Sequence, residues 1–158
     1  MKTAQMIFMR RAIELSGEYM RAGLGGPFGA IIVRGQEVLA EGSNRVTSTN
    51  DPTAHAEMVV IREACRRIGG FSLAGCELYT SCEPCPMCLG AIYWSRLDRV
   101  YFANTREDAA AIGFDDDAIY REFAKPISGR SLPFIHLPLP EGQRVFKEWV
   151  DKPDKIPY

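Results

Sequence analysis

The 158-residue sequence has almost no net charge and no long apolar run near its start. Nineteen basic and twenty acidic side chains give a formal net charge of −1, so the chain lacks the excess positive charge typical of proteins that bind polyanions. Arg10, Arg11 and Glu14 interrupt the N-terminal segment, which argues against a signal peptide or a membrane span there. We therefore expect a cytoplasmic protein that acts on neither nucleic acid nor membranes.

Histidine is scarce, with two residues, and the five cysteines are odd in number. An odd set leaves at least one thiol outside any disulfide framework, and Cys82, Cys85 and Cys88 lie within seven positions, a spacing typical of metal binding. With 46% apolar residues, the chain can bury a core without disulfides. No repeat or interdomain linker is evident, so residues 1–158 are expected to form one domain.

Apolar periodicity predicts helices and strands in alternation. Helices are expected over 4–22, from Pro52 to Ile68, after Pro86, around 119–123 and at 145–150. Strands are expected at 29–33, 37–41, 76–80, 99–103 and 133–137, with a loop over 42–51. This order predicts an α/β domain, and the hairpin formed by the first two strands makes its sheet mixed rather than purely parallel.

The strongest motif is H-A-E at positions 55–57, followed by P-C-P-M-C at 84–88. A histidine and a glutamate two apart, and then P-C-x-x-C, form the signature of zinc-dependent base deaminases. Cys85 and Cys88 are three apart, so both thiolates can reach one ion from a single helix face. With His55 they make three ligands, which leaves one tetrahedral position for water, as in a catalytic zinc site.

Glu57 is expected to carry protons rather than to bind the metal, because residues two apart on a helix diverge around its axis. Zinc lowers the pKa of a bound water to about 7 in favourable sites. Glu57 would take a proton from that water, protonate a ring nitrogen and then deliver a proton to the departing ammonia. Glu122 is a candidate second proton carrier, and a surface helix position is its competing interpretation.

Other interpretations of the cysteines remain open. A structural zinc site needs a fourth protein ligand, and the second histidine, His136, falls in an expected core strand. Cys82 forms an overlapping C-x-x-C with Cys85 and could compete as a ligand or close the fourth position. The prolines at 84 and 86 favour a helix start there, which leaves Cys82 in the preceding loop. A zinc-stabilised binding module is a further alternative, against which Glu57 argues because no structural site requires it.

Longer segments extend the motif. They are GGPFGA at 25–30, SNRV at 43–46, NDPTAHAE at 50–57, LYTSCEPCPMC at 78–88 and GFDD at 113–116. Together they resemble the bacterial guanine deaminases of the cytidine deaminase-like superfamily. The resemblance implies a three-layer α/β/α fold with a mixed five-stranded sheet, one catalytic Zn²⁺ per chain, and hydrolysis of guanine to xanthine and ammonia. It also implies a homodimer that exchanges its C-terminal segments, residues 141–158.

Matching positions imply the substrate contacts. Asn44 and Asp116 would hydrogen-bond the purine, Phe28 and Trp94 would line or stack against it, and Ala56 would contact it. Tyr158 would help close the active site of a second copy. Taken without the resemblance, these residues are read as a turn asparagine, core aromatics, a solvated acidic loop and a chain end.

Guanine has one independent argument in its favour. Its edge around C2 presents N–H donors at N1 and at the amino group, so the carboxylate of Asp116 is complementary to it, whereas cytosine presents an acceptor at N3. The nearest enzymatic rival is a tRNA adenosine deaminase, which would use the same zinc chemistry on a base in RNA. Such an enzyme is expected to carry a basic stripe, and none stands out in the sequence.

Overall fold

The computed structural model describes residues 2–158. The chain divides into two compact units, Met1–Tyr120 and Arg121–Tyr158. The first unit holds the sheet and the second is built from helices and extended chain, so each is described by itself.

The sheet has four strands in the order β2-β1-β3-β4. They are β1 (Gly29–Arg34), β2 (Glu37–Ser43), β3 (Glu77–Cys82) and β4 (Arg99–Asn104). β1 runs antiparallel to both β2 and β3, whereas β3 and β4 are parallel. The prediction of a mixed sheet is confirmed. The prediction of a fifth strand at 133–137 is wrong: the segment has no strand pairing, and the prolines at 133 and 138 remove backbone donors that a ladder needs.

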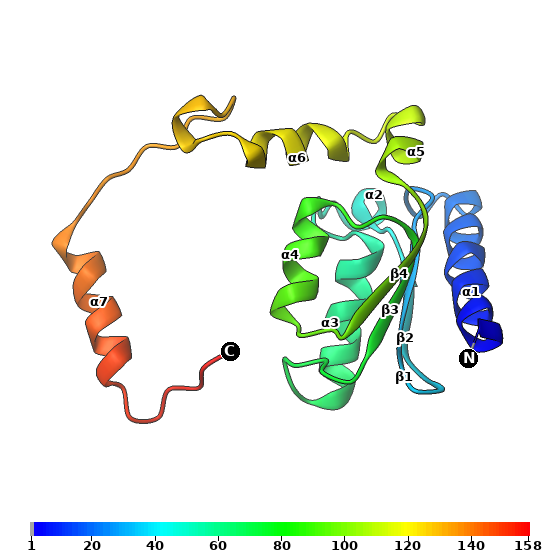
Figure 1. Cartoon of the computed structure of the whole chain (residues 1–158), viewed down its shortest axis with the longest axis horizontal. Helices are drawn as coiled ribbons and strands as arrows, with labels where there is room; N and C mark the ends of the chain where they lie inside the picture. Colours follow the sequence, from blue (N-terminus) through cyan, green and yellow to red (C-terminus); the bar gives the residue numbers. More distant parts are fainter. Residues whose placement is uncertain (1) are drawn as a thin grey trace. The chain divides into compact units, whose positions relative to one another are not determined.

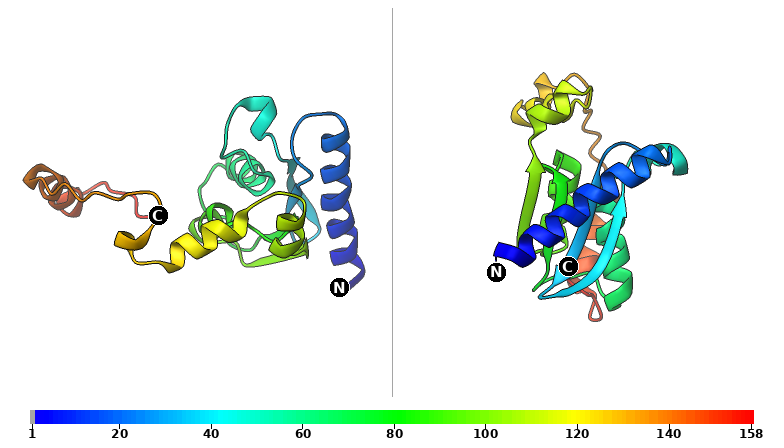
Figure 2. Two further views of the ribbon diagram at one scale, coloured as in Figure 1. Left: turned by 90° about the horizontal axis from the view of Figure 1, so that it is seen from above. Right: turned by 90° about the vertical axis from the view of Figure 1, so that its right-hand side faces the viewer.

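Helices cover both faces of the sheet. α1 (Lys2–Arg21) lies on one face, and α3 (Ala56–Ile68) and α4 (Pro86–Trp94) lie on the other (Figures 1 and 2). The α1 layer buries Ala12 and Leu15 against Ile31, Val33 and Tyr79. The opposite layer holds a larger core in which α3 and α4 pack on the remaining faces of β1, β2 and β3. The three layers of the predicted fold are therefore present.

Gly29 allows α1 to approach the sheet closely. A Cβ at this position would lie 2.3 Å from the carbonyl oxygen of Ala12 and 2.7 Å from the amide nitrogen of Ser16. Both are backbone atoms of α1 that cannot move aside alone. The first residue of β1 must therefore lack a side chain for this layer to form.

Two helix starts differ from the sequence prediction. The loop expected at 42–51 contains a short helix, α2 (Val46–Thr49), and α3 begins at Ala56 rather than near Pro52. Asp51 accepts hydrogen bonds from the backbone N–H and the hydroxyl of Thr53 at 2.8 and 2.7 Å. This Asx turn offers the backbone an alternative to the helix, so the helix starts later.

The remaining elements lead to the C-terminus. They are α5 (Arg106–Ala111), α6 (Asp116–Ala124), a 3₁₀ turn (Ile127–Gly129) and α7 (Pro140–Asp151). Among residues 121–158 none is fully buried, and His136, expected in a core strand, is exposed. No helix in residues 2–158 combines the length and the apolar character needed to cross a membrane.

Candidate metal centre and substrate cavity

The metal-binding motif occupies the starts of two helices that lie on the same face of the sheet. His55 is the N-cap residue of α3, and Cys85 is the N-cap residue of α4; both have extended backbone. Cys88 lies in the first turn of α4, and Pro86 begins that helix without needing an amide donor. Because helix N-termini carry a partial positive charge, both starts favour thiolate and carboxylate groups.

His55, Cys85 and Cys88 form one cluster, with donor atoms within 4.8 Å of one another. The Nδ1 atom of His55 lies 3.5 Å from the Sγ of Cys85 and 3.6 Å from the Sγ of Cys88. Ligands at ordinary Zn–N and Zn–S distances in a tetrahedron lie roughly 3.6 Å apart. The spacing and the nitrogen–sulfur donor set therefore fit a tetrahedral zinc ion.

The thiols are electrostatically prepared for a cation. Hydrogen bonds from Cys88 and His55 lower the pKa of Cys85 to about 4 against the opposing effect of burial. Cys85 raises the pKa of Cys88 in turn, because the proton between them stays on Cys88. A divalent cation would displace that proton. The thiolate of Cys85 is also the main cause of a raised pKa at His55.

Glu57 is buried in the first turn of α3, with 6% of its surface exposed. Its Oε1 atom accepts a hydrogen bond of 2.9 Å from the hydroxyl of Thr80 on β3, and its Oε2 atom lies 3.6 Å from the Sγ of Cys88. Burial raises the pKa of Glu57 above its ordinary value. A carboxyl group in this setting holds a proton more readily than an exposed one does, beside the three clustered side chains.

Cys82 is not part of the cluster. It lies at the end of β3 rather than in a loop. Its S–H donates a hydrogen bond to the carbonyl oxygen of Thr105, with 3.5 Å between the sulfur and the oxygen. Burial raises its pKa to about 11. Cys82 therefore remains a protonated thiol at neutral pH, which favours Cys85 and Cys88 as the ligand pair.

A cavity of about 490 Å³ opens over this cluster. Three residues implied by the resemblance, Phe28, Asn44 and Asp116, lie in its wall with His55 and Glu57. The wall also contains the glycines at 23, 25 and 26, Val46, Thr47, Pro52, Cys82, Glu83, Cys85 and Phe114. The cavity is large enough for a bicyclic base and is lined by residues of the first unit.

The amide of Asn44 is held in one orientation. Its Oδ1 atom accepts hydrogen bonds from the backbone N–H groups of Gly26, at 3.3 Å, and Val46, at 3.2 Å. The side-chain NH₂ group is then the part of Asn44 left to act as a donor towards the cavity. A Cβ on Gly25 would lie 2.0 Å from the backbone oxygen of Asn44, so the loop before β1 must be glycine-rich to approach this residue.

Sequence reasoning missed two residues that shape the site. Phe114 lies in the cavity wall and meets the ring of Phe28 edge-to-face, with centroids 4.7 Å apart and an interplanar angle of 87°. Thr80 orients Glu57 through its hydroxyl. Phe114 is the second residue of the GFDD segment, so that segment could have indicated it. The role of Thr80 depends on its hydrogen bond to Glu57, 23 positions away, which no local pattern reveals.

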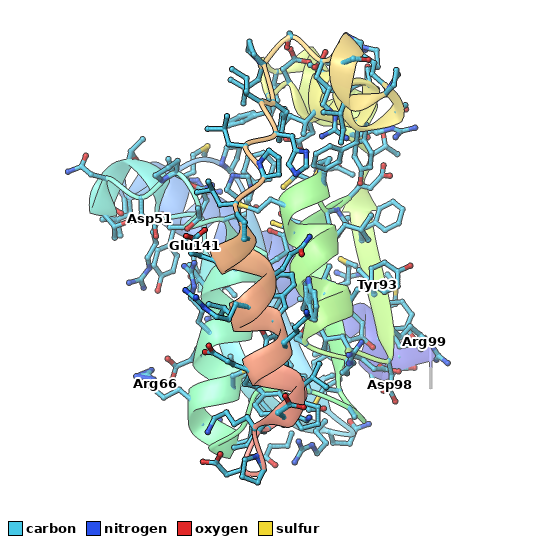
Figure 3. The ribbon with its side chains drawn as sticks, turned by 90° about the vertical axis from the view of Figure 1, so that its left-hand side faces the viewer. Asp51, Arg66, Tyr93, Asp98, Arg99 and Glu141 are labelled. Carbon is cyan, nitrogen blue, oxygen red and sulfur yellow. The ribbon has the colours of Figure 1, made fainter. Side chains whose placement is uncertain are left out.

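Three other expected residues lie elsewhere. Trp94 ends α4 with 63% of its surface exposed and Tyr158 is 74% exposed; neither lines this cavity. The neighbouring Tyr93 points outward from the same helix, as Arg66 does from α3 (Figure 3). Ala56 is fully buried in the α3 core.

Glu122 makes contacts of its own. Its carboxylate accepts hydrogen bonds from Lys125 at 2.5 Å and from the backbone N–H of Ser131 at 2.8 Å. The Lys125 contact is the main cause that lowers the pKa of Glu122 to about 2. A group that stays ionised to such low pH is a poor proton carrier, so these contacts favour a structural role at the turn after α6.

Comparison with known proteins agrees with this geometry. The family model described as the cytidine and deoxycytidylate deaminase zinc-binding region matches residues 2–104. The guanine deaminase of Bacillus subtilis is 51% identical over 151 residues, 96% of this chain and 97% of that protein. A tRNA-specific adenosine deaminase of Aquifex aeolicus is 36% identical over 126 residues, 80% of this chain and 81% of that protein.

Two solved structures of guanine deaminases are also similar to this chain. The X-ray structure of the B. subtilis guanine deaminase matches with a TM-score of 0.94 at 51% identity, covering 96% of this chain and 97% of that one. A guanine deaminase structure from Nitrosomonas europaea matches with a TM-score of 0.65 at 35% identity, covering 69% and 63%. The sequence resemblance is confirmed, and the chain belongs to the cytidine and deoxycytidylate deaminase zinc-binding family.

Proposed function

We propose that this protein is a zinc-dependent guanine deaminase that converts guanine and water to xanthine and ammonia. One observation carries the proposal: a buried glutamate, Glu57, lies beside the His55, Cys85 and Cys88 cluster in a cavity that also presents Asp116. A binding module has no need of a buried carboxyl group with a raised pKa at this point. The similarity to the B. subtilis guanine deaminase over 96% of the chain supports guanine as the substrate.

The metal and Glu57 have separate tasks. His55, Cys85 and Cys88 would hold zinc, which when bound lowers the pKa of a coordinated water and acts as a Lewis acid. Glu57 takes a proton from the attacking water and delivers it to N3 of guanine as the water oxygen bonds to C2. It then takes the remaining proton from that oxygen and passes it to the amino nitrogen, whose bond to C2 breaks as ammonia leaves. Thr80 keeps the carboxylate of Glu57 aimed at this point by donating to Oε1. Burial raises the pKa of Glu57 above its ordinary value, which favours the protonated form that donates to the substrate.

The cavity wall supplies the substrate contacts. The carboxylate of Asp116 accepts hydrogen bonds from the N–H groups on the C2 edge of guanine, and the NH₂ of Asn44 donates to an acceptor elsewhere on the purine. Phe28, held edge-to-face by Phe114, offers its ring to the base. Ala56, which lies between His55 and Glu57, would contact the base through its backbone. An apolar cavity wall with polar groups at Asp116 and Asn44 favours a planar base that presents N–H donors at N1 and at the C2 amino group.

We propose that the C-terminal segment, residues 141–158, is exchanged between two copies. Residues 121–158 contain no fully buried side chain, although many are apolar; Ile135, Leu137 and Phe146 are each at least 78% exposed. A segment of this size does not hold such residues in water without a surface to cover them. A second copy supplies that surface, and the exchange brings Tyr158 of one copy over the cavity of the other.

We also place the enzyme in the cytoplasm. All five cysteines are free thiols, and the ligand role of Cys85 and Cys88 requires that they stay reduced. A base held in a cavity of about 490 Å³ and closed by Tyr158 would be separated from any polynucleotide, so free guanine rather than RNA is the expected substrate.

The proposal is tested by measuring ammonia release from guanine, cytidine and an RNA anticodon hairpin with adenosine in the loop, using purified protein of known zinc content. We expect one zinc per chain and rapid conversion of guanine to xanthine, identified by its ultraviolet spectrum. Ammonia released only from the RNA would favour an editing enzyme. Stoichiometric zinc without ammonia release from any substrate would favour a binding module.

A further inference from the structure

Tyr120 links the helix that carries Asp116 to the loop that carries the metal ligands. The hydroxyl of Tyr120 donates a hydrogen bond of 2.8 Å to the backbone carbonyl oxygen of Pro84. Pro84 is buried and directly precedes Cys85. Its carbonyl belongs to the peptide group that sets the position of the Cys85 backbone, so a bond to this oxygen joins α6 to the metal loop.

The position of Tyr120 on α6 makes this bond informative. α6 begins at Asp116, and Tyr120 comes four residues later, so the two side chains lie on the same helix face about one turn apart. Asp115 accepts a hydrogen bond from the N–H of Ala118 at 3.2 Å and thereby caps the helix start. Asp116 thus sits in a short turn whose one end is capped and whose other end is fastened by Tyr120.

Arg106 and Glu83 strengthen the same junction. The guanidinium of Arg106 lies 5.0 Å from the centre of the Tyr120 ring, a distance at which the cation and the ring attract each other. The backbone N–H of Arg106 donates to the Oε2 of Glu83 at 3.1 Å, and Glu83 directly precedes Pro84. Tyr120 is therefore held from its ring by α5 and from its hydroxyl by the metal loop.

We propose that Tyr120 is a positioning residue that holds Asp116 against the metal centre through its hydrogen bond to Pro84. The inference rests on the proposed function, because the substrate role of Asp116 is assigned there. Tyr120 is not among the residues that line the cavity, so it acts through the residues that it holds. It fixes how far the first turn of α6 stands from Cys85, and this distance determines whether the Asp116 carboxylate meets the substrate edge while Glu57 meets the reacting atoms.

The test is a double-mutant cycle on the zinc-loaded protein with Tyr120→Phe and Asp116→Asn. Tyr120→Phe removes only the hydroxyl, and we expect kcat/KM for guanine to fall about fivefold, the effect of one hydrogen bond, with zinc content unchanged. In the Asp116→Asn background the same change should have almost no further effect, because the residue that it positions has already lost its charge. Equal losses in both backgrounds, or loss of zinc, would overturn the proposal.

A matched control is Tyr101→Phe. Tyr101 is also half-buried, and its hydroxyl accepts hydrogen bonds from Gln5 at 2.8 Å and Arg99 at 3.2 Å on the α1 side of the sheet. The Tyr101→Phe substitution is expected to leave kcat/KM for guanine unchanged. If it lowered kcat/KM as much as Tyr120→Phe does, the loss of any tyrosine hydroxyl would have this effect, and the proposal would be contradicted.

Hydrogen exchange separates this inference from the proposed function. Tyr120→Phe should speed amide exchange in peptides that cover residues 113–121 and leave α3 peptides unchanged. If the wild-type protein does not deaminate guanine, the proposed function fails while exchange still reports on Tyr120. Unchanged exchange in residues 113–121 would show that the hydroxyl does not fasten this turn.

Discussion

Residues 2–120 and residues 121–158 differ in what their side chains do. The first region buries two apolar layers on either side of a sheet and places the metal ligands, Glu57 and the cavity at one end of it. In the second region α7 carries Val145, Phe146 and Val150 exposed, and no residue is fully buried. The contrast teaches that the His55, Cys85 and Cys88 cluster, Glu57 and the cavity wall come from the first region, while the apolar side chains of the second region form no buried core of their own.

The largest expected effect lies in the first region. Glu57→Gln should retain zinc, because the amide is the same size and Glu57 is no ligand, and should lower guanine turnover by about a thousandfold through loss of the proton carrier. Zinc content and ammonia release measure the two properties separately. Glu63→Gln is the matched control, since Glu63 lies on the same helix and pairs with Arg66. A Glu57→Gln variant with near wild-type turnover would remove Glu57 from the mechanism.

Two glycines sharpen the comparison through stability. Gly29→Ala places a Cβ against the α1 backbone at 2.3 Å and should lower the free energy of unfolding by about 2–3 kcal/mol. Gly142→Ala in α7 meets no atom within 4 Å and should be neutral or stabilise by up to about 1 kcal/mol, because alanine favours the helix. Urea denaturation followed by circular dichroism measures both. Equal losses at the two positions would mean that α7 is as tightly packed as the sheet.

The sequence predicted that His55, Cys85 and Cys88 lie together because the information for this cluster is local. The positions of His55 and Glu57, and of Cys85 and Cys88, are set by spacing within one helix start each. The prediction that the N-termini of α3 and α4 lie close together came from the complete motif, which combines both segments. Asp116 and Asn44 were identified through the family resemblance rather than from their own chemistry. Their place in the cavity wall could not follow from periodicity, since it depends on loops that approach from three different elements.

What the sequence failed to predict depends on long-range or competing interactions. The Asx turn of Asp51 delays the start of α3, and the same residues read equally well as a first helical turn. The apolar stretch 133–137 has strand-like composition, but a strand exists only when a neighbour pairs with it. Thr80 on β3 orients Glu57 on α3 from 23 positions away, and the link from Tyr120 to Pro84 spans 36 positions. Such contacts are set by the fold and leave no local pattern.

The smallest expected effect concerns the ion pair between Arg11 on α1 and Glu41 on β2, which lie 2.7 Å apart. The hydrogen bond from Arg11 lowers the pKa of Glu41 in the folded state. The pair therefore contributes above the unfolded pKa of Glu41 and loses its contribution as pH falls through the lower folded pKa. Both side chains are over a third exposed, so Glu41→Gln should cost at most about 0.5 kcal/mol at pH 7.

The pH dependence of that difference is the measurement. Unfolding midpoints of wild type and Glu41→Gln should converge as the pH falls from 6 towards 3, because protonation removes the same charge that the substitution removes. A difference that stays constant over this range would show that Arg11 does not stabilise the ionised form. This change should leave guanine turnover untouched, as the pair lies on the α1 side of the sheet.

Complementation between two defective chains tests most directly whether the C-terminal segment of one chain completes the active site of another. One chain carries Glu57→Gln with an intact C-terminus, and the other keeps Glu57 but ends at Ile156, so it lacks Pro157 and Tyr158. Each chain alone should form a dimer with little guanine turnover, at least about tenfold below wild type for the shortened chain, because its cavity stays open to water. Mixed dimers are isolated through two different affinity tags.

Exchange of the C-terminal segments predicts that the mixed dimer contains one complete site, in which Glu57 of the shortened chain is closed by Tyr158 of the other chain. Its turnover should recover to about half that of the wild-type dimer, since one site in two is complete. A mixed dimer no more active than the shortened chain alone would show that the segment serves its own chain and would contradict the account.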